Sequence, residues 1–325
     1  MNNKTVIPTS GTTILTDNDV LVHLELDELI RALATAFRDD FSSYRIPPRV
    51  ITSGEESTSL LMPCYGDGVF GLKVAIMNGE TGRASRVLRS TYTLYDASTG
   101  DSLVFLEADT FTDLRTAAVS AVATSALALP NARTLGIFGT GRLARAHVPA
   151  LFCVRPFTEV LICGSSPARS SEFAESLRAE YGIVARAVDA ATCAHESEVL
   201  CACTTSRGPL FDGDLVQAGA HLNLVGSFTP ATREVDTRTI TRSHVVVDTY
   251  GALEEAGDLL IPLGAGDIRR EHILGDLHEV LSGARTARRN ESDITAFESV
   301  GSAMEDIVAA KCLLAALREP SPVAQ

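Results

Sequence analysis

A glycine-rich turn between a short apolar strand and a helix constrains this sequence more than any other feature. The segment is Leu135-Gly-Ile-Phe-Gly139-Thr-Gly141-Arg-Leu-Ala144, a GxGxxA pattern. The first glycine permits a tight bend, the second lets the backbone approach a diphosphate, and a small third residue lets the helix and strand pack closely. The start of the helix adds unpaired N–H groups. The motif therefore predicts a dinucleotide-binding Rossmann domain; the alternative is a glycine-rich connection without a ligand.

The residues after position 128 support this prediction because short apolar strands alternate with helices. Such alternation is typical of βαβ units and a parallel sheet. We expect a Rossmann domain over residues 129–301. Its expected strands are 134–138, 159–163, 183–187, 199–203, 221–225 and 244–248, and its expected helices are 143–152 and 167–181.

The first part of the chain follows a different pattern, without strict alternation. We expect strands at 13–16, 71–77, 90–95 and 101–106, with helices at 27–41 and 113–128. This pattern predicts an α+β domain with an antiparallel element. A further helix at 303–317 indicates that the chain returns to this domain, which would comprise residues 1–128 and 302–325. The predicted fold class is α/β, and 325 residues favour two domains over one core.

Composition excludes several classes of function. A net charge of −13 argues against a nucleic-acid partner, which requires clustered basic residues. The N-terminal MNNKTVIPTSGTT lacks an apolar segment, and no apolar run is long enough for a membrane span. The seven Cys show no metal-ligand spacing, and core packing is the expected role of Cys201 and Cys203. We therefore expect a cytoplasmic protein without a metal site.

The end of the second Rossmann strand bears on the choice of cofactor. An acidic residue usually holds the ribose 2′-hydroxyl there, but this sequence has Gly164-Ser165-Ser166-Pro-Ala-Arg169. Two hydroxyls and a guanidinium, helped by Arg142, favour NADP(H), with NAD(H) possible; alternatively, Ser166 only caps the next helix and Arg169 is solvated. The residues expected to contact the dinucleotide are Gly139, Thr140, Gly141, Arg142, Leu143, Ala144, Ser165, Ser166, Arg169, Thr204, Val225, Gly226 and Ser227.

Three basic residues of the first domain are candidates for substrate binding. Lys73 interrupts an apolar strand, Arg115 lies early in an alanine-rich helix, and Arg49 follows two prolines. If they converge, they form a pocket for a carboxylate, which matches the forked guanidinium of arginine. Spacing alone does not establish convergence, and the alternative for each residue is a surface or edge cation.

These segments resemble the ornithine cyclodeaminase/μ-crystallin family over nearly the whole chain. The resemblance lies in Gly-Leu-Lys73-Val, Leu-Arg115-Thr-Ala-Ala, the glycine turn, His221-Leu-Asn-Leu-Val-Gly226 and Phe297-Glu-Ser-Val-Gly301-Ser-Ala-Met-Glu-Asp306. It implies a Rossmann domain inserted into a substrate-binding and dimerisation domain, a homodimer, and bound NAD(P). It also implies that Arg49 and Arg115 hold a substrate carboxylate in the cleft between domains, while Lys73 contacts the carboxylate or the reacting imine.

The family contains cyclodeaminases, alanine dehydrogenases and ketimine reductases, and one position helps to choose among them. Cyclodeaminases carry an Asp where this chain has Phe228, and that Asp engages the substrate amine. Without an acceptor there, ring closure of ornithine or lysine is disfavoured. We expect NAD(P)H-dependent reduction of a small imino acid or 2-oxo acid, with Lys73, Arg49 and Arg115 as the catalytic set.

Two other readings stay open: an amino-acid cyclodeaminase with internally recycled NAD, and a μ-crystallin-like protein that binds NADPH and a ligand without catalysis. Gly301 and Asp306 are assigned to the substrate loop. Asp306 would support the basic residues or, alternatively, complement the dipole of its helix. His147 is expected to have a packing role.

Overall fold

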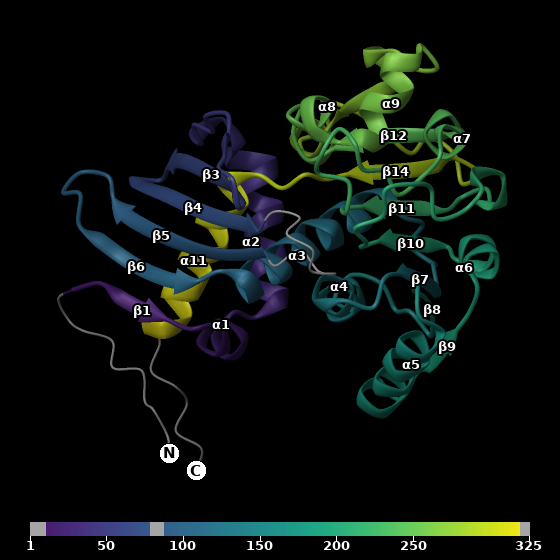
Figure 1. Cartoon of the computed structure of the whole chain (residues 1–325), viewed down its shortest axis with the longest axis horizontal. Helices are drawn as coiled ribbons and strands as arrows, with labels where there is room; N and C mark the ends of the chain where they lie inside the picture. Colours follow the sequence, from purple (N-terminus) through teal and green to yellow (C-terminus); the bar gives the residue numbers. More distant parts are fainter. Residues whose placement is uncertain (1–10, 79–87, 319–325) are drawn as a thin grey trace. The chain divides into compact units, whose positions relative to one another are not determined.

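The computed structural model describes residues 11–78 and 88–318, so most of the N-terminal segment considered above lies outside the described residues. The chain forms two compact units, unit 1 (Met1–Arg115 with Ser302–Gln325) and unit 2 (Thr116–Gly301). Figure 1 shows the elements of each unit.

Unit 1 is built on a six-stranded sheet in the order β1-β6-β5-β4-β3-β2. β1 runs parallel to β6, and the other neighbouring strands are antiparallel. The antiparallel element expected from the sequence is therefore present, but β2 and β3 were not predicted. The strands are β1 (Thr13–Leu15), β2 (Val50–Ser53), β3 (Ser57–Gly66), β4 (Val69–Asn78), β5 (Leu88–Asp96) and β6 (Ser102–Glu107).

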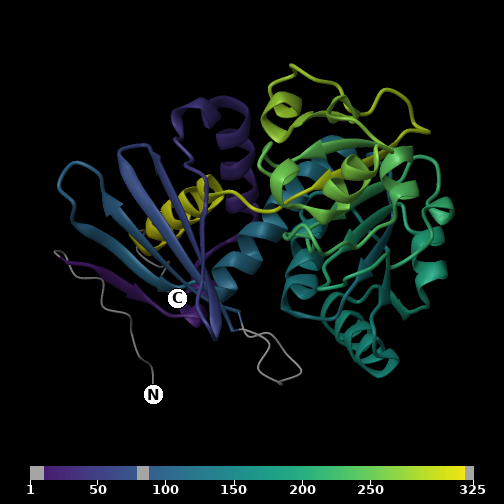
Figure 2. The same ribbon diagram turned by 45° about the horizontal axis from the view of Figure 1, so that its top comes forward.

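Helices cover one face of this sheet. α11 (Ala303–Arg318) packs against β3, β4 and α2 (Leu26–Thr35), and α1 (Asp17–His23) also contacts α11. Figure 2 shows α11 in yellow along the sheet. The predicted helix at 27–41 continues beyond α2 as a π-helical turn and a short 3₁₀ turn that ends at Ser43. The last helix, α11, thus belongs to unit 1, whose residues precede and follow unit 2 in the sequence.

Unit 2 contains an eight-stranded sheet in the order β13-β12-β14-β11-β10-β7-β8-β9, with parallel pairing throughout. From β7 the chain builds outward through β8 and β9, and then crosses to β10 on the other side. A reversal of this kind creates the crevice in which doubly wound sheets bind ligands, beyond the carboxyl ends of the strands. The strands are β7 (Thr134–Phe138), β8 (Glu159–Cys163), β9 (Val184–Ala187), β10 (Val199–Ala202), β11 (His221–Leu224), β12 (Ser243–Val247), β13 (Ile273–Asp276) and β14 (Ile294–Glu298).

The helices of unit 2 follow the predicted alternation. α5 spans the residues expected for it, and α4 begins one residue earlier than expected. β13 and β14 were not predicted from the sequence, although β14 pairs with both β11 and β12 in the interior of the sheet. The helices are α4 (Arg142–Phe152), α5 (Pro167–Tyr181), α6 (Ala190–Glu196), α7 (Thr237–Arg242), α8 (Ala252–Glu255), α9 (Gly257–Ala265) and α10 (Leu277–Leu281), with 3₁₀ turns at Gly213–Leu215 and Arg270–His272.

α3 (Asp109–Leu127) belongs to both units, because the division falls after Arg115. From the sequence, the whole helix was expected to belong to the first domain and to begin at residue 113. It instead begins at Asp109, whose side chain accepts hydrogen bonds from the backbone N–H and the hydroxyl of Ser90. No helix among the described residues is long and apolar enough to cross a membrane.

Candidate active site

Lys73 lies on the helix-covered face of the unit 1 sheet. In β4, buried residues alternate with more accessible ones, and Lys73 is buried on the same face as Gly71 and Ala75. Its Nζ lies 3.0 Å from both carboxylate oxygens of Asp306. A buried ammonium requires such a partner, because desolvation of an unpaired charge is very unfavourable. Lys73 is therefore an interior cation and not an edge residue.

Arg115 joins the same cluster from α3. Its Nη1 donates to Oε2 of Glu305 at 2.6 Å, and its Nε lies 3.0 Å from Oδ1 of Asp306. Glu305 and Asp306 occupy the first turn of α11 and are fully buried. Asp306 thus links two of the three predicted basic residues. It also lies where a carboxylate complements the helix dipole, so both proposed roles are compatible with its position.

This ion cluster, defined as Lys73, Arg115, Glu305 and Asp306, contains two cations and two carboxylates. Burial lowers the pKa of Lys73 to about 8, with a further decrease from the positive charge of Arg115. The carboxylates of Asp306 and Glu305 act in the opposite direction. Lys73 can therefore gain or lose a proton close to neutral pH, which suits a group that transfers protons.

Two buried hydroxyls in unit 1 have no hydrogen-bond partner among the described residues, those of Tyr92 and Thr112. Tyr92 lies directly opposite Lys73 across β4 and β5, and Thr112 precedes Arg115 by one turn of α3. A Cβ atom at Gly71 would overlap the Tyr92 hydroxyl, which explains the glycine in the Gly-Leu-Lys segment. Such unpaired groups beside charged residues are typical of sites that accept a polar ligand.

Arg49, the third predicted basic residue, lies in the segment leading into β2 and is half-buried. It belongs to the same unit as Lys73 and Arg115. Its convergence with them on one substrate carboxylate stays a prediction.

The glycine turn of unit 2 has the geometry that a diphosphate site requires. Gly139 adopts a φ of +115°, and a Cβ atom there would lie 2.6 Å from the carbonyl oxygen of Cys203. Gly141 is the N-cap of α4, and a Cβ atom there would meet open space. No side chain of the described residues caps this helix, so its first N–H groups are available to an anion. The fully buried Ala144 fills the third position of the motif.

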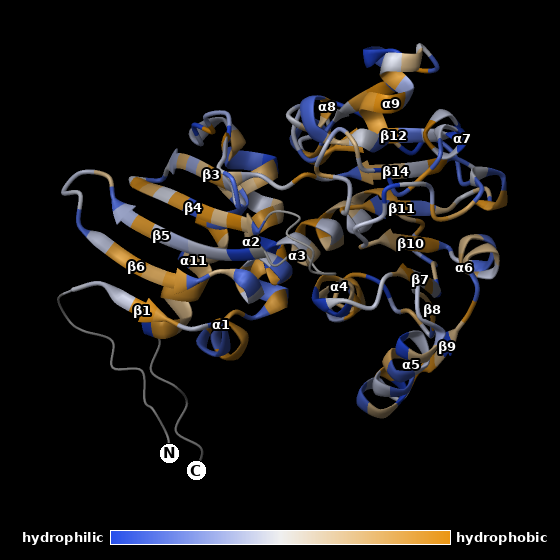
Figure 3. Ribbon diagram, in the orientation of Figure 1, coloured by the Kyte–Doolittle hydropathy of each residue, from blue (hydrophilic) through white to orange (hydrophobic). Residues whose placement is uncertain are grey.

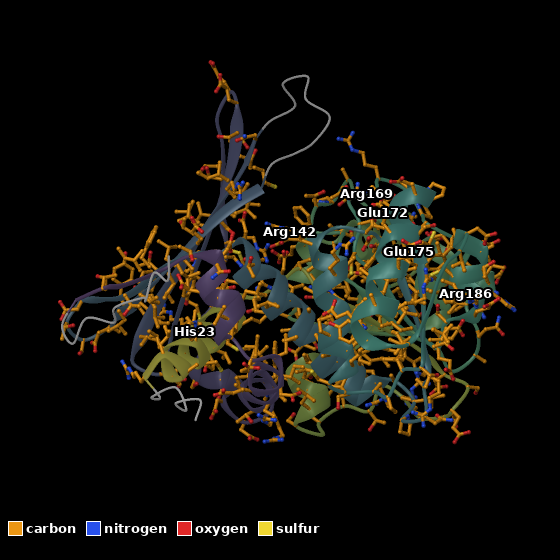
Figure 4. The ribbon with its side chains drawn as sticks, turned by 90° about the horizontal axis from the view of Figure 1, so that it is seen from below. His23, Arg142, Arg169, Glu172, Glu175 and Arg186 are labelled. Atoms are coloured by element: carbon orange, nitrogen blue, oxygen red, sulfur yellow. The ribbon has the colours of Figure 1, made fainter. Side chains whose placement is uncertain are left out.

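The residues that follow β8 lie at the start of α5. Ser165 and Arg169 are exposed, whereas Ser166 is half-buried and accepts a hydrogen bond from the Arg169 backbone at 3.4 Å. Ser166 is therefore the N-cap of α5, as the alternative reading proposed. Figure 4 labels Arg142, the first residue of α4, and Arg169, which lies in the first turn of α5. The Ser166 hydroxyl hydrogen stays available to a phosphate, because the cap uses only the oxygen.

The loops after β10 and β11 contain the other predicted cofactor residues. Glu234 accepts hydrogen bonds from Thr204 and from the backbone of Gly226. Val225 and Ser227 are buried, and Phe228 is half-buried. Glu234 was not among the residues predicted from the sequence, although a buried glutamate requires hydrogen-bond donors.

Two further assignments have a structural outcome. His147 is fully buried, its ring nitrogens contact Ser120 at 3.0 Å and the Leu143 carbonyl at 2.8 Å, and burial lowers its pKa to about 4. These contacts agree with a packing role. Gly301 adopts a φ of +80°, and its N–H donates to Asp248 at 2.7 Å just before α11 begins.

With this geometry established, comparison with known proteins identifies the family. The sequence model of the ornithine cyclodeaminase/mu-crystallin family matches residues 10–319. The chain belongs to this family. A relative from Bacillus cereus, 33% identical over 313 residues that cover 92% of this chain and 95% of the relative, is named Delta(1)-pyrroline-2-carboxylate reductase.

Solved structures of the family share the fold. The Delta(1)-pyrroline-2-carboxylate reductase of Thermococcus litoralis, in complex with NADH and L-proline, has a TM-score of 0.88 and 32% identity, covering 93% of this chain and 96% of that one. An archaeal alanine dehydrogenase dimer with bound NAD has a TM-score of 0.88 and 27% identity, covering 94% and 95%. The Rossmann assignment is thereby confirmed.

Proposed function

We propose that this chain is an NAD(P)H-dependent reductase of a small imino acid, with Δ1-pyrroline-2-carboxylate as the first candidate substrate and a 2-oxo acid as a less favoured one. The observation that supports this function best is the buried ion cluster, in which Lys73 and Arg115 share the carboxylate of Asp306 and Arg115 also pairs with Glu305. The same chain has the glycine turn expected of a dinucleotide site. Relatives named for this reaction match more than nine-tenths of the chain.

The ion cluster can bind a carboxylate without being dismantled. An ammonium has three N–H donors, and the two oxygens of Asp306 occupy at most two of them. Arg115 lies beside this ammonium, because both cations contact Asp306. We expect the substrate carboxylate to bind the third donor of Lys73, with Arg115 and Arg49 supplying guanidinium groups to the same carboxylate.

Reduction of the imine requires a hydride at carbon and a proton at nitrogen. The reduced nicotinamide supplies the hydride when it is bound. Lys73 is the candidate proton source, because its charged form is present below a pKa of about 8 and its neutral form is accessible above it. Arg115 and Arg49 hold the substrate in place, and such positioning can supply several kcal/mol of the barrier, up to roughly 7–11 in well-aligned cases.

Phe228 argues against the lyase alternative. This aromatic residue follows Ser227 after β11 and has no acceptor for a substrate amine. A cyclodeaminase needs an acceptor within hydrogen-bond reach of the amine that it deprotonates or orients. A passive ligand-binding role is also disfavoured, because a buried basic cluster is not required to hold a hydrophobic ligand.

The test is an assay of NADPH and NADH oxidation with Δ1-pyrroline-2-carboxylate, Δ1-piperideine-2-carboxylate, and pyruvate supplied with ammonia or methylamine. We expect turnover with at least one cyclic imine. Release of ammonia from ornithine without added reductant would instead establish the cyclodeaminase. Dinucleotide binding without turnover of any of these compounds would favour the binding protein.

We further propose a preference for NADP(H). The end of β8 presents Ser165, Ser166 and the exposed Arg169 and lacks a carboxylate that would repel a 2′-phosphate. The two solved relatives hold NADH or NAD, so this preference concerns the residues of this chain. Arg169→Ala should lower kcat/KM for NADPH and leave that for NADH unchanged, whereas Arg178→Ala, on the same helix, should change neither. Equal use of both cofactors by the unmodified enzyme would contradict the preference.

A homodimer through the outer face of the unit 1 sheet is the proposed assembly. This face exposes large apolar residues, including Ile14 and its cross-strand partner Phe105, together with Ile76. Figure 3 shows hydrophobic stretches along β4 and β6. Exposed apolar patches of this kind mark association surfaces. Phe105→Glu should convert the dimer to a monomer in analytical ultracentrifugation, and an unchanged mass would contradict the proposed surface.

A further inference from the structure

Unit 2 buries four carboxylates at the carboxyl ends of its central strands: those of Glu234, Asp248, Asp258 and Glu298. Each residue is 0% exposed. The ion cluster of unit 1 does not include them, and the proposed reaction assigns them no role. We call this set the acid group.

Glu234 joins the ends of two strands. Its Oε1 accepts hydrogen bonds from the N–H and the hydroxyl of Thr204, both at 2.6 Å, just after β10. Its Oε2 accepts from the N–H of Gly226 at 2.8 Å, just after β11. A Cβ atom at Gly226 would lie 2.6 Å from this carboxyl group, so the loop approaches Glu234 as closely as glycine permits. The position of Glu234 thus determines the conformation of two loops assigned to the dinucleotide.

Asp258 holds Glu234 in turn. Its Oδ1 accepts from the N–H groups of Glu234 and Val235, both at 2.9 Å. The N–H of Asp258 donates to the Ser227 hydroxyl at 3.2 Å, which fixes a third residue assigned to the dinucleotide. Asp248 acts similarly near β14, where its Oδ2 accepts from the Ser299 hydroxyl and from the N–H groups of Val300 and Gly301.

Glu298, the last residue of β14, is different. Neither of its carboxyl oxygens has a hydrogen-bond partner among the described residues, although the side chain is fully buried. Its side chain points to the same face of the sheet as Ala296, which lies in the apolar core. Burial raises the pKa of Glu298 well above its ordinary value, and the negative charges of Asp258, Glu234 and Asp248 raise it further.

Within the described part of the chain, the charges that act on Glu298 are those of the three other carboxylates. The positive charge of Arg233 acts on Asp258, where it lowers the pKa. Burial likewise raises the pKa of Glu234 to about 7 and that of Asp258 to about 6, against the lowering effect of their hydrogen-bond donors. The acid group therefore cannot be fully charged without large repulsion in a medium of low dielectric constant.

We propose that Glu298 carries a proton that keeps Glu234 in position, so that Glu234 acts as a positioning residue for the dinucleotide site and binding is coupled to retention of that proton. This inference rests on the proposed function only in assuming that unit 2 binds a nicotinamide dinucleotide. Ionised Glu298 would repel the carboxylate of Glu234, which can move away only by releasing Thr204 and Gly226. The additional charge would also repel the diphosphate.

The test measures the affinity for NADH at a series of pH values in the unmodified chain, in Glu298→Gln and in Glu291→Gln. NADH is the probe because it lacks the 2′-phosphate, which titrates near pH 6. Glu291 is an exposed residue of the same unit, so its substitution makes the same chemical change, carboxyl to amide, at the surface. Calorimetry from neutral pH up to the highest pH at which the chain stays folded follows the loss of this proton, because burial raises the pKa of Glu298 well above its ordinary value.

We expect the unmodified chain and Glu291→Gln to lose affinity as the pH rises, approaching about tenfold per pH unit if the ionised form does not bind. Glu298→Gln should keep its neutral-pH affinity at the highest pH. The inference is overturned if Glu298→Gln follows the curve of the unmodified chain, or if neither curve depends on pH. Absence of NADH binding at every pH would overturn the proposed function itself and is thus distinguishable.

A second measurement avoids dependence on the folding of Glu298→Gln. At the upper end of the pH range, NADH binding to the unmodified chain should be accompanied by proton uptake. Titrations in two buffers with different ionisation enthalpies measure that uptake. A binding enthalpy that does not depend on the buffer would contradict the coupling.

Discussion

The two units bury charged groups in different ways. In unit 1, Lys73 and Arg115 lie against Glu305 and Asp306, so that each buried charge has an opposite charge beside it. In unit 2, Glu234 and Asp258 are held mainly by backbone N–H groups and hydroxyls. Ion pairs present charged donors that an anionic ligand can share, whereas carboxylates bound to the backbone fix the loops that carry them. The comparison thus separates the group proposed to bind substrate from the group proposed to position a cofactor site.

The largest expected effect comes from breaking an ion pair in unit 1. Lys73→Met leaves Asp306 with one cationic partner fewer, and removal of one member of a buried pair costs about 3–5 kcal/mol. In the double variant Lys73→Met, Asp306→Leu, most of this loss should disappear, because Arg115 keeps Glu305. Urea unfolding measures both effects. Equal destabilisation by the single and double variants would show that the pair is not coupled.

Removal of Glu234 should have a smaller effect, located in unit 2. Glu234→Ala deletes hydrogen bonds from Thr204 and Gly226 to a charged acceptor, each worth about 1.5–3 kcal/mol. We expect NADH affinity to fall by about tenfold or more. Glu291→Ala is the control, and calorimetry is the measurement. If Glu234→Ala bound NADH as tightly as the unmodified chain, Glu234 would not position the dinucleotide site and the proposed difference between the two units would fail.

The two types of burial also predict different dependence of stability on pH. Folded Glu298 keeps its proton at pH values where the unfolded chain loses it, so the free energy of unfolding should fall as the pH rises above the ordinary glutamate pKa. The loss is at most about 1.4 kcal/mol per pH unit until the folded group also ionises. Glu298→Gln should flatten this slope in denaturant titrations, while Glu291→Gln should not.

Lys73 gives the corresponding pH dependence in unit 1. Its charged form is present below a pKa of about 8 and is lost above it, so kcat/KM for the imine should decline as the pH rises past this value. The decline should reach about tenfold per pH unit if only the charged form is active. Lys73→Arg stays charged over this range, and any residual activity should show no such decline. If kcat/KM of Lys73→Arg declined with the same midpoint, the decline would have to come from a group other than Lys73.

The smallest effect is expected for Tyr92→Phe. The Tyr92 hydroxyl has no hydrogen-bond partner among the described residues, so its removal should change the free energy of unfolding by less than about 1 kcal/mol. A loss of substrate affinity without loss of stability would show that this hydroxyl contacts the ligand. Thermal unfolding and KM, measured on the same preparation, separate the two results.

Sequence patterns predicted the local elements of both units well where periodicity and turn chemistry agree. The GxGxxA turn placed β7 and α4 because glycine and small residues are required at fixed positions of that turn. Ser166 and Pro167 fixed the start of α5, since a serine cap followed by proline is a strong helix signal. The predicted start of α3 lies one turn too far along the chain. The helix begins at Asp109, which is held by a contact with Ser90 of β5 that the local sequence does not reveal.

Other features depend on contacts between distant residues, which spacing does not reveal. β14 is a short strand that ends in a buried charged residue, so its sequence has no apolar pattern long enough to identify it. Asp306 contacts Lys73 and Arg115, which precede it in the sequence by 233 residues (306 − 73) and 191 residues (306 − 115). Glu305 was missed, although two adjacent carboxylates at the start of an otherwise apolar helix signal buried cations.

Isotope transfer is the most direct test of the central claim that this chain moves a hydride to an imine carbon. The enzyme would be supplied with Δ1-pyrroline-2-carboxylate and NADPH deuterated at nicotinamide C4, in separate experiments for each face of the ring. We predict proline with one deuterium at C2 from one of the two cofactors, and severe loss of this product in Arg115→Ala. Proline without deuterium from either cofactor, or no proline at all, would contradict the account.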